Sequence, residues 1–417
     1  MAVSTAEIDS IAGNRARARV VALCFVAQNC AMGIPFASFG PMLASTEQHF
    51  GVSRTVASTG MSLIMLAMGG LTPVLGALLR RGSIRTGMIV GALLSAVGYW
   101  GLAVLHSFSL ALVMFALIGA GALLTAVIGP LVIISRWFDS DRAKVLSFVN
   151  LPIALFLTPY IVARLLPVYG RFAILGTIGT AFLLLAPLLL LLRDRPLCRS
   201  PEPVVKLGTA LEGPRVGSAF IFKEPAFWLL SIGIGIMAGA GTAYVVHIVP
   251  FGMERHMSLP AASAVLSAYT GAGIVGTLLF GWIADRLGPP NALAISAACQ
   301  TGLWWTLLQV NDSWLYLVSA LMGACIVPLV ALLGAALSRL FDAGAVGRAV
   351  GYSYSVKLPF VFVFAPAMGR LFDMSGGYRM PFLLTSALMV LSTALFLLMS
   401  LTVSRSTRSG AHAQIRG

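Results

Sequence analysis

Residues 346–371 read VGRAVGYSYSVKLPFVFVFAPAMGRL, an apolar stretch long enough for one helix to cross a bilayer. Lys357 lies near its middle, 11 residues from Val346 and 14 residues from Leu371. At about 1.5 Å of rise per residue, the lysine is too deep for its ammonium to reach water at either end. A charge at the bilayer centre costs at least about 2.5–3.5 kcal/mol, so such a residue faces a water-filled cavity or a partner and by default marks a substrate or ion path. The alternative is a structural lysine paired with a buried carboxylate.

The composition extends this interpretation to the whole chain. Of its 417 residues, 58% are hydrophobic and 10% are charged, whereas soluble domains carry about 25% charged residues. The net charge of +14 comes from basic residues in short loops between apolar segments, which is typical of loops that face anionic lipid. The five cysteines show no C-x-x-C or other metal-ligand spacing. The sequence therefore predicts an all-α, multi-pass membrane protein, with lipids as neighbours, without a cofactor or metal and without a nucleic-acid partner.

Twelve apolar segments are bounded by turn or charge signals. They span residues 20–43, 54–79, 84–105, 108–134, 143–167, 171–192, 225–251, 260–284, 289–309, 313–338, 346–371 and 380–403. An even number of spans places both termini on one side of the membrane. If that side is the cytoplasm, its loops and tails hold 21 of the 28 Lys and Arg residues, against six on the opposite side. The positive-inside rule then predicts cytoplasmic termini, in a cell inner membrane of the bacterial type.

The loops divide the spans into two halves. The only long loop, residues 193–224, is basic and rich in Pro and Gly, and we interpret it as a cytoplasmic linker. It separates an N-terminal six-helix bundle, 18–192, from a C-terminal one, 225–403. The remaining segments, 1–17 and 404–417, are predicted to be cytoplasmic tails, with disorder over residues 1–14 and 404–417. Nothing in the sequence indicates an obligate oligomer, so we expect a monomer.

An internal repeat relates the two halves. Ser135-Arg-Trp-Phe-Asp139 after the fourth span matches Ser338-Arg-Leu-Phe-Asp342 after the tenth. The helix that follows each copy contains an x-Leu-Pro triplet, Asn150-Leu-Pro in the first half and Lys357-Leu-Pro in the second. Asn150 and Lys357 are therefore pseudo-equivalent, and the charge is present on one side only. Repeated six-helix halves of this kind place a substrate site at their interface near the midplane.

The loop after the eighth span carries a family resemblance. Gly281-Trp-Ile-Ala-Asp285-Arg286-Leu-Gly288 resembles the G-x-x-x-D-R-x-G loop of the major facilitator superfamily. The resemblance implies two pseudo-symmetric bundles of six helices and cytoplasmic charge contacts by Asp285 and Arg286. The first-half copy departs from the pattern, because Arg80 stands where the aspartate is expected. The other candidate gating residues are the basic residues of the repeated loops, Arg136, Arg142, Arg339 and Arg348.

Within the superfamily, the chain is similar to the group of monocarboxylate transporters and oxalate/formate antiporters. The similarity rests on Phe50-Gly-Val-Ser-Arg54, on Ser135-Arg-Trp-Phe138 with Arg142, and on a lysine in the middle of the eleventh span. In the antiporter branch that lysine is held to bind the substrate carboxylate, and Lys357 occupies the matching place. The arginine that these carriers place in the eighth span is replaced by Thr277. A dicarboxylate held by two cations is therefore not expected.

The acidic residues limit the chemistry of the site. All 14 lie in loops, tails or span ends, so organic cations and sodium lack an intramembrane carboxylate. One buried cation favours one anionic group as its partner. The other candidate substrate-binding residues are polar groups within the spans: Gln28, Asn29, Asn150, Tyr244, Tyr269, Thr270 and Tyr354. His247, near the outer end of the seventh span, is the candidate for carrying a coupled proton, and a histidine that is merely hydrogen-bonded is the alternative.

We therefore expect a secondary transporter of a small organic anion, a monocarboxylate, that works by alternating access. Coupling is either proton symport through Lys357 or His247, or anion exchange. The alternative is an efflux carrier for a neutral or amphipathic compound, with Lys357 only setting polarity. A receptor or scaffold is a third class, which the gating-loop charges disfavour. No P-loop or H-E-x-x-H motif is present, and no enzyme activity is expected.

Overall fold

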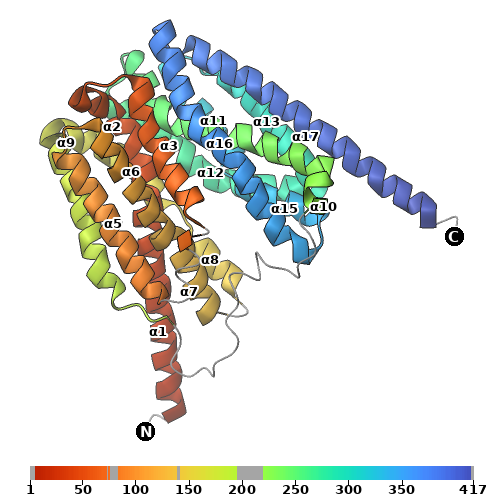
Figure 1. Ribbon diagram of the computed structural model, residues 1–417, viewed down its shortest axis with the longest axis horizontal. Helices are drawn as coiled ribbons and strands as arrows, with labels where there is room; N and C mark the ends of the chain where they lie inside the picture. Colours follow the sequence, from red (N-terminus) through yellow and green to blue (C-terminus); the bar gives the residue numbers. More distant parts are fainter. Residues whose placement is uncertain (1–4, 73, 76–82, 139–140, 195–218, 415–417) are drawn as a thin grey trace. The chain divides into compact units, whose positions relative to one another are not determined.

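The computed structural model describes residues 5–72, 74–75, 83–138, 141–194 and 219–414, and these residues contain helices and no strand. Each predicted span coincides with helix in the described residues (Figure 1), apart from a break in the fifth; the end of the second span, 76–79, lies outside the described residues. By length and composition, nine described helical stretches could cross a membrane. One of them, Lys144–Leu189, holds two predicted spans, and the two spans that remain correspond to α3, Arg54–Gly70, and α13, Pro289–Thr306.

The chain divides into two compact units. One contains residues 1–42 and 63–204, and the other contains residues 43–62 and 205–417. The division after residue 204 falls within the predicted linker, most of which lies outside the described residues. Residues 43–62 belong by sequence to the first six spans, yet they cluster with the second unit.

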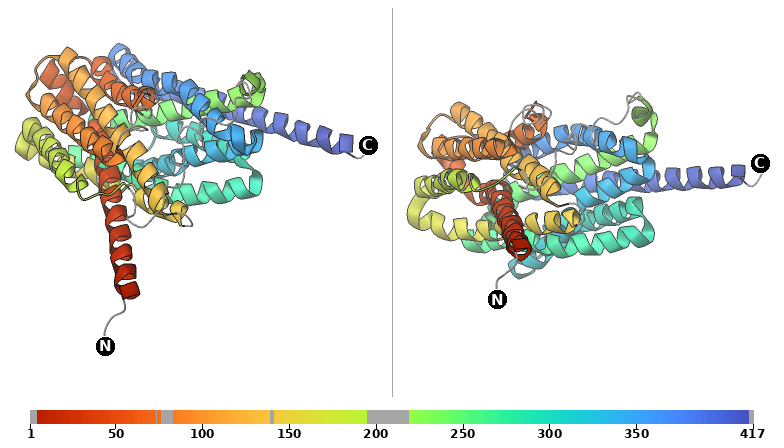
Figure 2. Two further views of the ribbon diagram at one scale, coloured as in Figure 1. Left: turned by 60° about the horizontal axis from the view of Figure 1, so that its bottom comes forward. Right: turned by 90° about the horizontal axis from the view of Figure 1, so that it is seen from below.

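The first unit is built on α5 (Ile84–Val104), which packs against α6 (Phe108–Ala122) and α9 (Ile153–Leu189). Helices α5 and α9 lie side by side in each view (Figures 1 and 2). Ser83 caps α5 by accepting a hydrogen bond from the backbone N–H of Thr86 at 3.2 Å. The helix α9 turns sharply at Gly170, whose φ of 74° suits glycine, and this turn separates the fifth and sixth predicted spans.

Two short π-helices interrupt the first unit. One, η1 (Asn29–Gly33), lies between α1 (Thr5–Gln28) and α2 (Ile34–Phe50). The other, η2 (Leu123–Ile128), joins α6 to α7 (Gly129–Trp137). Such π-turns are rare and occur mostly at functional sites, and neither was predicted.

The fifth span is broken where a continuous helix was predicted. Helix α8 (Arg142–Val149) ends before Asn150, and α9 begins at Ile153, directly after Pro152. Proline has no N–H to donate and its ring clashes with the carbonyl four residues earlier, so Pro152 weakens the helix at this position. The backbone between the two helices closes in short turns, with Leu151 N–H donating to Phe148 O and Ile153 N–H donating to Leu151 O.

The second unit is built on α11 (Pro225–Glu254), which packs against α16 (Ala343–Ser375), α17 (Arg379–Gln414) and α12 (Leu259–Leu287). Helices α12 and α14 (Asp312–Ile326) form a second pair, and α13 packs on α17, beside α15 (Leu329–Leu340). The short helix α10 (Ala219–Lys223) precedes α11. Among the described residues, α1 includes Thr5 and α17 includes Gln414, so helix covers parts of both tails that were predicted to be disordered.

The first turns of α3 lie along α16, which explains why residues 43–62 join the second unit. Pro366 has no N–H for the carbonyl of Phe362, and the Ser62 hydroxyl donates to that carbonyl instead, at 2.6 Å. Seven residues after Phe362, α16 passes close to the start of α3. A Cβ at Gly369 would lie 2.9 Å from Cα of Thr55, so glycine at this position allows the two helices to approach each other.

Candidate functional site

Lys357 lies on a face of α16 that packs within the second unit. Ser353, four residues earlier, is fully buried and accepts a hydrogen bond from the Ser231 hydroxyl of α11 at 3.0 Å. Val361, four residues later, is 6% exposed. Because residues four apart share one helix face, Lys357, itself half-buried, lies on the packed face of α16.

The lysine has an aromatic neighbour from its own helix. Its Nζ lies 3.8 Å from the centroid of the Tyr354 ring, as expected for residues three apart. Among the described residues, Lys357 makes no hydrogen bond and no ion pair. A cation–π contact stabilises by only about 0.5–2 kcal/mol, less than a desolvated ammonium requires. Within the described part of the chain, its charge is therefore left for an anion to balance.

Of the other predicted residues of the second unit, Tyr244 and Thr270 use their hydroxyls in hydrogen bonds inside the protein. Tyr244 is buried, donates to the Ser319 hydroxyl at 2.7 Å and stacks on Tyr269, with ring centroids 4.7 Å apart. The Ser319 hydroxyl in turn donates to Val265 O at 2.7 Å. Thr270 donates to Ser267 O of its own helix at 3.0 Å. These contacts hold α11, α12 and α14 together.

In the first unit, Asn29 stabilises the break in the fifth span. Its Oδ1 accepts the backbone N–H of Ala154 at 2.8 Å, and its Nδ2 donates to Phe25 O at 3.1 Å. The N–H of Ala154 would otherwise lack a helical partner, because α9 begins at Ile153. Asn150, at the end of α8, is exposed, and Oε1 of Gln28 is buried without a partner among the described residues.

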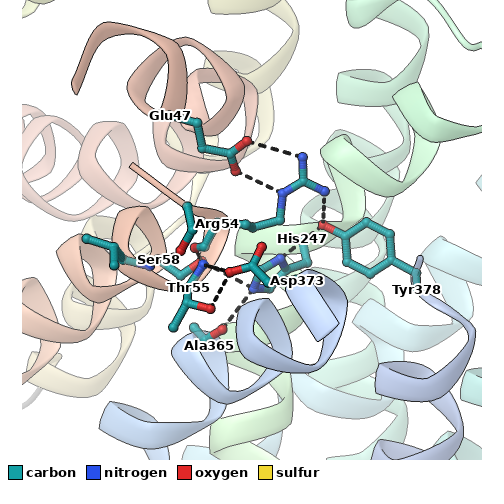
Figure 3. Close-up of polar contacts among 10 residues, drawn as sticks. Glu47, Arg54, Thr55, Ser58, His247, Ala365, Asp373 and Tyr378 are labelled. Carbon is teal, nitrogen blue, oxygen red and sulfur yellow. Dashed lines mark hydrogen bonds and ion pairs between the residues drawn. The ribbon is translucent and has the colours of Figure 1, made fainter. Parts of the chain in front are cut away.

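His247 lies in a connected polar network at one end of the second unit (Figure 3). Its imidazole is fully buried, with Nε2 2.9 Å from Ala365 O and Nδ1 3.1 Å from the Tyr378 hydroxyl. Ala365 lies on the same face of α16 as Lys357 and eight residues further along, about 12 Å on the helix axis. The network and the lysine are therefore placed along one helix face.

Arg54, the first residue of α3, connects this network to α2. Its Nε and Nη2 donate to the Glu47 carboxylate at 2.8 and 3.3 Å, and its Nη1 donates to the Tyr378 hydroxyl at 3.1 Å (Figure 3). The guanidinium also lies over the Phe372 ring, 4.0 Å from its centroid. Arg54 and Glu47 are 15% and 19% exposed, so this ion pair is largely buried. Burial raises the pKa of Tyr378 above its ordinary value, so the phenol keeps its proton.

A second bridge from α3 to α16 lies beside the first. Oδ2 of Asp373 accepts the backbone N–H of Thr55 at 3.0 Å and the Thr55 hydroxyl at 2.5 Å. The carboxylate is exposed and takes the position of an N-terminal cap on α3, supplied from another helix.

Comparisons with known proteins identify the family. The family model of the Major Facilitator Superfamily matches residues 24–358 and 254–416. The chain belongs to this superfamily. It is 24% identical to human Monocarboxylate transporter 11 over 409 residues, which cover 91% of this chain and 82% of that protein. It is 23% identical over 372 residues to YcxA, an uncharacterised MFS-type transporter of Bacillus subtilis, with 82% of this chain and 85% of that protein covered.

A solved structure supports the same fold. The crystal structure of a bacterial homologue of the human lysosomal transporter Spinster, in an inward-facing and unoccupied conformation, matches 94% of this chain and 98% of its own, with a TM-score of 0.72 and 14% identity. The predicted twelve-helix architecture of the major facilitator superfamily and the resemblance to the monocarboxylate transporter group are confirmed. The protein is an integral, multi-pass membrane transporter.

The gating residues expected from the superfamily are at helix ends. Asp285 and Arg286 end α12 and are exposed, and the Arg286 guanidinium lies 4.1 Å from the centroid of the Trp282 ring. Asp285 makes no ion pair or hydrogen bond among the described residues. Arg136 and Arg339 lie in the last turns of α7 and α15, Arg142 is the first residue of α8, and Arg348 lies in the second turn of α16. The first-half loop with Arg80 lies outside the described residues.

The sequence analysis missed Glu47, Arg54, Asp373 and Tyr378 as functional candidates, because all four lie in or next to short loops. One signal could have found them: the loops that hold Arg54 and Asp373 were predicted on the same side of the membrane as the end of the helix that carries His247. Opposite charges at one membrane surface can pair, although a single sequence does not say which ones do.

Proposed function

We propose that this transporter moves a small monovalent organic anion, a monocarboxylate, across the bacterial inner membrane by alternating access, with both termini in the cytoplasm. The observation that supports the proposal most directly is Lys357, a cation at the middle of a spanning helix, on an interior face, with only the Tyr354 ring as a partner in the described part of the chain. The similarity to a protein named Monocarboxylate transporter 11 points in the same direction.

Tyr354 suits a carboxylate-binding role beside the lysine. Its side chain is 38% exposed while its ring lies under the ammonium, so its hydroxyl is free to reach a ligand oxygen. An ammonium and a phenol together can hold one carboxylate through two charge-assisted hydrogen bonds. The described spans offer no second cation on this face of α16, which favours one carboxylate over two.

Coupling has two candidate forms. In proton symport, His247 or Lys357 would carry the proton. In anion exchange, Lys357 would stay occupied by one anion or another, so that an empty carrier does not cross. The two are distinguished by whether uptake into anion-free vesicles responds to an imposed pH gradient or requires anion inside.

The proposal is tested by thermal unfolding of the detergent-purified protein with a panel of small monocarboxylates, dicarboxylates and the corresponding neutral amides. A ligand at about 100 times its Kd stabilises by about 2.7 kcal/mol. We expect a monocarboxylate to raise the midpoint of the wild type and of Lys144→Ala, whose lysine is 86% exposed, and to leave Lys357→Ala unmoved. If only neutral or aromatic compounds raise the midpoint, and raise it equally in Lys357→Ala, the chain is instead an efflux carrier.

A further inference from the structure

The hydrogen bonds around His247 fix where its proton is. A carbonyl oxygen can only accept, so Nε2, 2.9 Å from Ala365 O, carries the hydrogen. Nδ1 is then the acceptor, and the Tyr378 hydroxyl donates to it across 3.1 Å. Arg54 has only donors, so its Nη1 donates to the Tyr378 oxygen. Each group in this chain is satisfied when the imidazole is neutral.

Protonation of His247 removes the acceptor on which the chain depends. Both ring nitrogens would then be donors, and Nδ1–H would point at a hydroxyl oxygen that already accepts from Arg54. The Tyr378 proton would lose its partner, and two cations would face one phenol in a buried site. A buried donor without an acceptor and two facing like charges both destabilise the arrangement.

The charged groups around the imidazole do not change the conclusion that protonation of His247 weakens these hydrogen bonds. Arg54 faces it from α3 and is already paired with Glu47 of α2. Asp373 of α16 is exposed and engaged with Thr55. Glu254, the last residue of α11, is exposed, faces Arg54 and accepts the backbone N–H of Tyr378. The charged residues of α12, Asp285 and Arg286, lie at its far end, and Arg370 of α16 and Arg379 at the start of α17 are exposed.

We propose that the chain Glu47–Arg54–Tyr378–His247 is an acid-released latch, which holds residues 43–62 against α11 and α16 and lets them separate when His247 takes up a proton. The predicted topology places this latch on the extracellular side, where closure would shield the Lys357 face of α16 from outside. The proposal rests on transport by alternating access and not on the substrate being a carboxylate. The Asp373–Thr55 bridge and the Ser62–Phe362 hydrogen bond do not involve the imidazole and remain when His247 is protonated.

Hydrogen–deuterium exchange of the full-length protein, without substrate, tests the latch. Wild type is compared with His247→Gln at the same pH, so that the intrinsic pH dependence of exchange cancels. The glutamine amide can donate to Ala365 O and accept from Tyr378 as neutral histidine does, but it does not titrate. We expect equal exchange of the backbone amides of residues 43–62 at pH 7.5, and at least about three-fold faster exchange in the wild type at pH 5. Tyr378→Phe, which removes the bridging hydroxyl, should exchange fast at both pH values.

Equal exchange of wild type and His247→Gln at pH 5 would overturn the latch, as would a difference of the same size at both pH values. If His247→Gln shows fast exchange throughout the chain because the variant is misfolded, the latch is tested with spin labels in a chain that retains His247. Labels at the exposed positions 56 and 374 report the separation of α3 from α16. A longer distance must gain population as the pH falls from 7.5 to 5; an unchanged distribution overturns the proposal. Neither measurement contains an anion, so failure here leaves the thermal-shift test of Lys357 untouched.

Discussion

The two x-Leu-Pro triplets are related by the internal repeat but have opposite structural outcomes. At Asn150-Leu151-Pro152 the helix breaks into α8 and α9, whereas Lys357-Leu358-Pro359 lies inside the continuous helix α16. Each proline removes one backbone donor, so the proline alone does not determine whether the helix breaks. The difference lies in the neighbours: Asn29 supplies an acceptor for Ala154 N–H in the first half, and the Phe360 ring packs closely against Gly235 of α11 in the second.

This asymmetry separates two roles that the repeat could have given to both halves. In the first half the helix is broken between α8 and α9 at residues 150–152, and we call this break the joint. The Asn29 side chain of η1 stabilises the joint. The second half has an unbroken helix that carries Lys357 and, further along the same face, the carbonyl bound by His247. Alternating access in transporters of this kind is largely rocking of one half against the other around a fixed binding site. We infer that the charge is kept on the half whose helix does not bend.

The largest expected effect comes from making the second triplet match the first. Lys357→Asn should fold, because the lysine has no ion pair among the described residues, but should lose saturable anion uptake in proteoliposomes. Removing one partner of a buried charge contact costs about 2–5 kcal/mol, which is about 30-fold or more in affinity. Lys144→Asn, at an exposed lysine, is the matched control. Uptake by Lys357→Asn at the wild-type rate would contradict a substrate-binding lysine.

Crowding the joint should have the next largest effect. A Cβ at Gly33 would lie 2.6 Å from Cβ of Ala154 and 2.8 Å from the backbone N of Leu155. Gly33→Ala should therefore lower the thermal midpoint, by an amount equivalent to about 1–3 kcal/mol of overpacking. Gly302→Ala in α13, where a Cβ meets nothing within 4 Å, should leave the midpoint unchanged or raise it. Equal midpoints for the two variants would mean that η1 does not support the break as closely as the structure shows.

The twelve spans could be predicted because length and apolarity alone determine which segments can cross a bilayer. The break at residue 150 could not, since Pro152 and Pro359 look alike in sequence and the deciding acceptor, Asn29, is 125 positions from the amide it binds. Lys357 was found from its depth in a span. Arg54 and Tyr378 were missed, because a contact over 324 positions is not visible in one sequence. The roles predicted for Lys357 and His247 stay predictions.

A double-mutant cycle measures the joint directly. Asn29→Ala leaves the partly buried N–H of Ala154 without its acceptor, which costs at most about 1–3 kcal/mol of unfolding free energy. In a Pro152→Ala background the helix can close and give that N–H the carbonyl of Asn150, so Asn29→Ala should cost clearly less. We expect a coupling of about 1 kcal/mol between the two positions in chemical or thermal unfolding. Strict additivity would show that the asparagine acts on something other than the break.

The smallest effect should come from Pro359→Ala in the continuous helix. The alanine supplies an N–H for the carbonyl of Ser355, four residues earlier, and a hydrogen bond of this kind is worth about 0.5–1.5 kcal/mol. The midpoint should rise slightly or stay where it is, because α16 is already helical through this position. Uptake should also be retained, since the helix break that we connect with transport is the one at residues 150–152 in the first half. A marked loss of uptake with an unchanged midpoint would mean that α16 also bends during transport at Pro359, and the contrast between a jointed and a continuous helix would then describe one state of the cycle only.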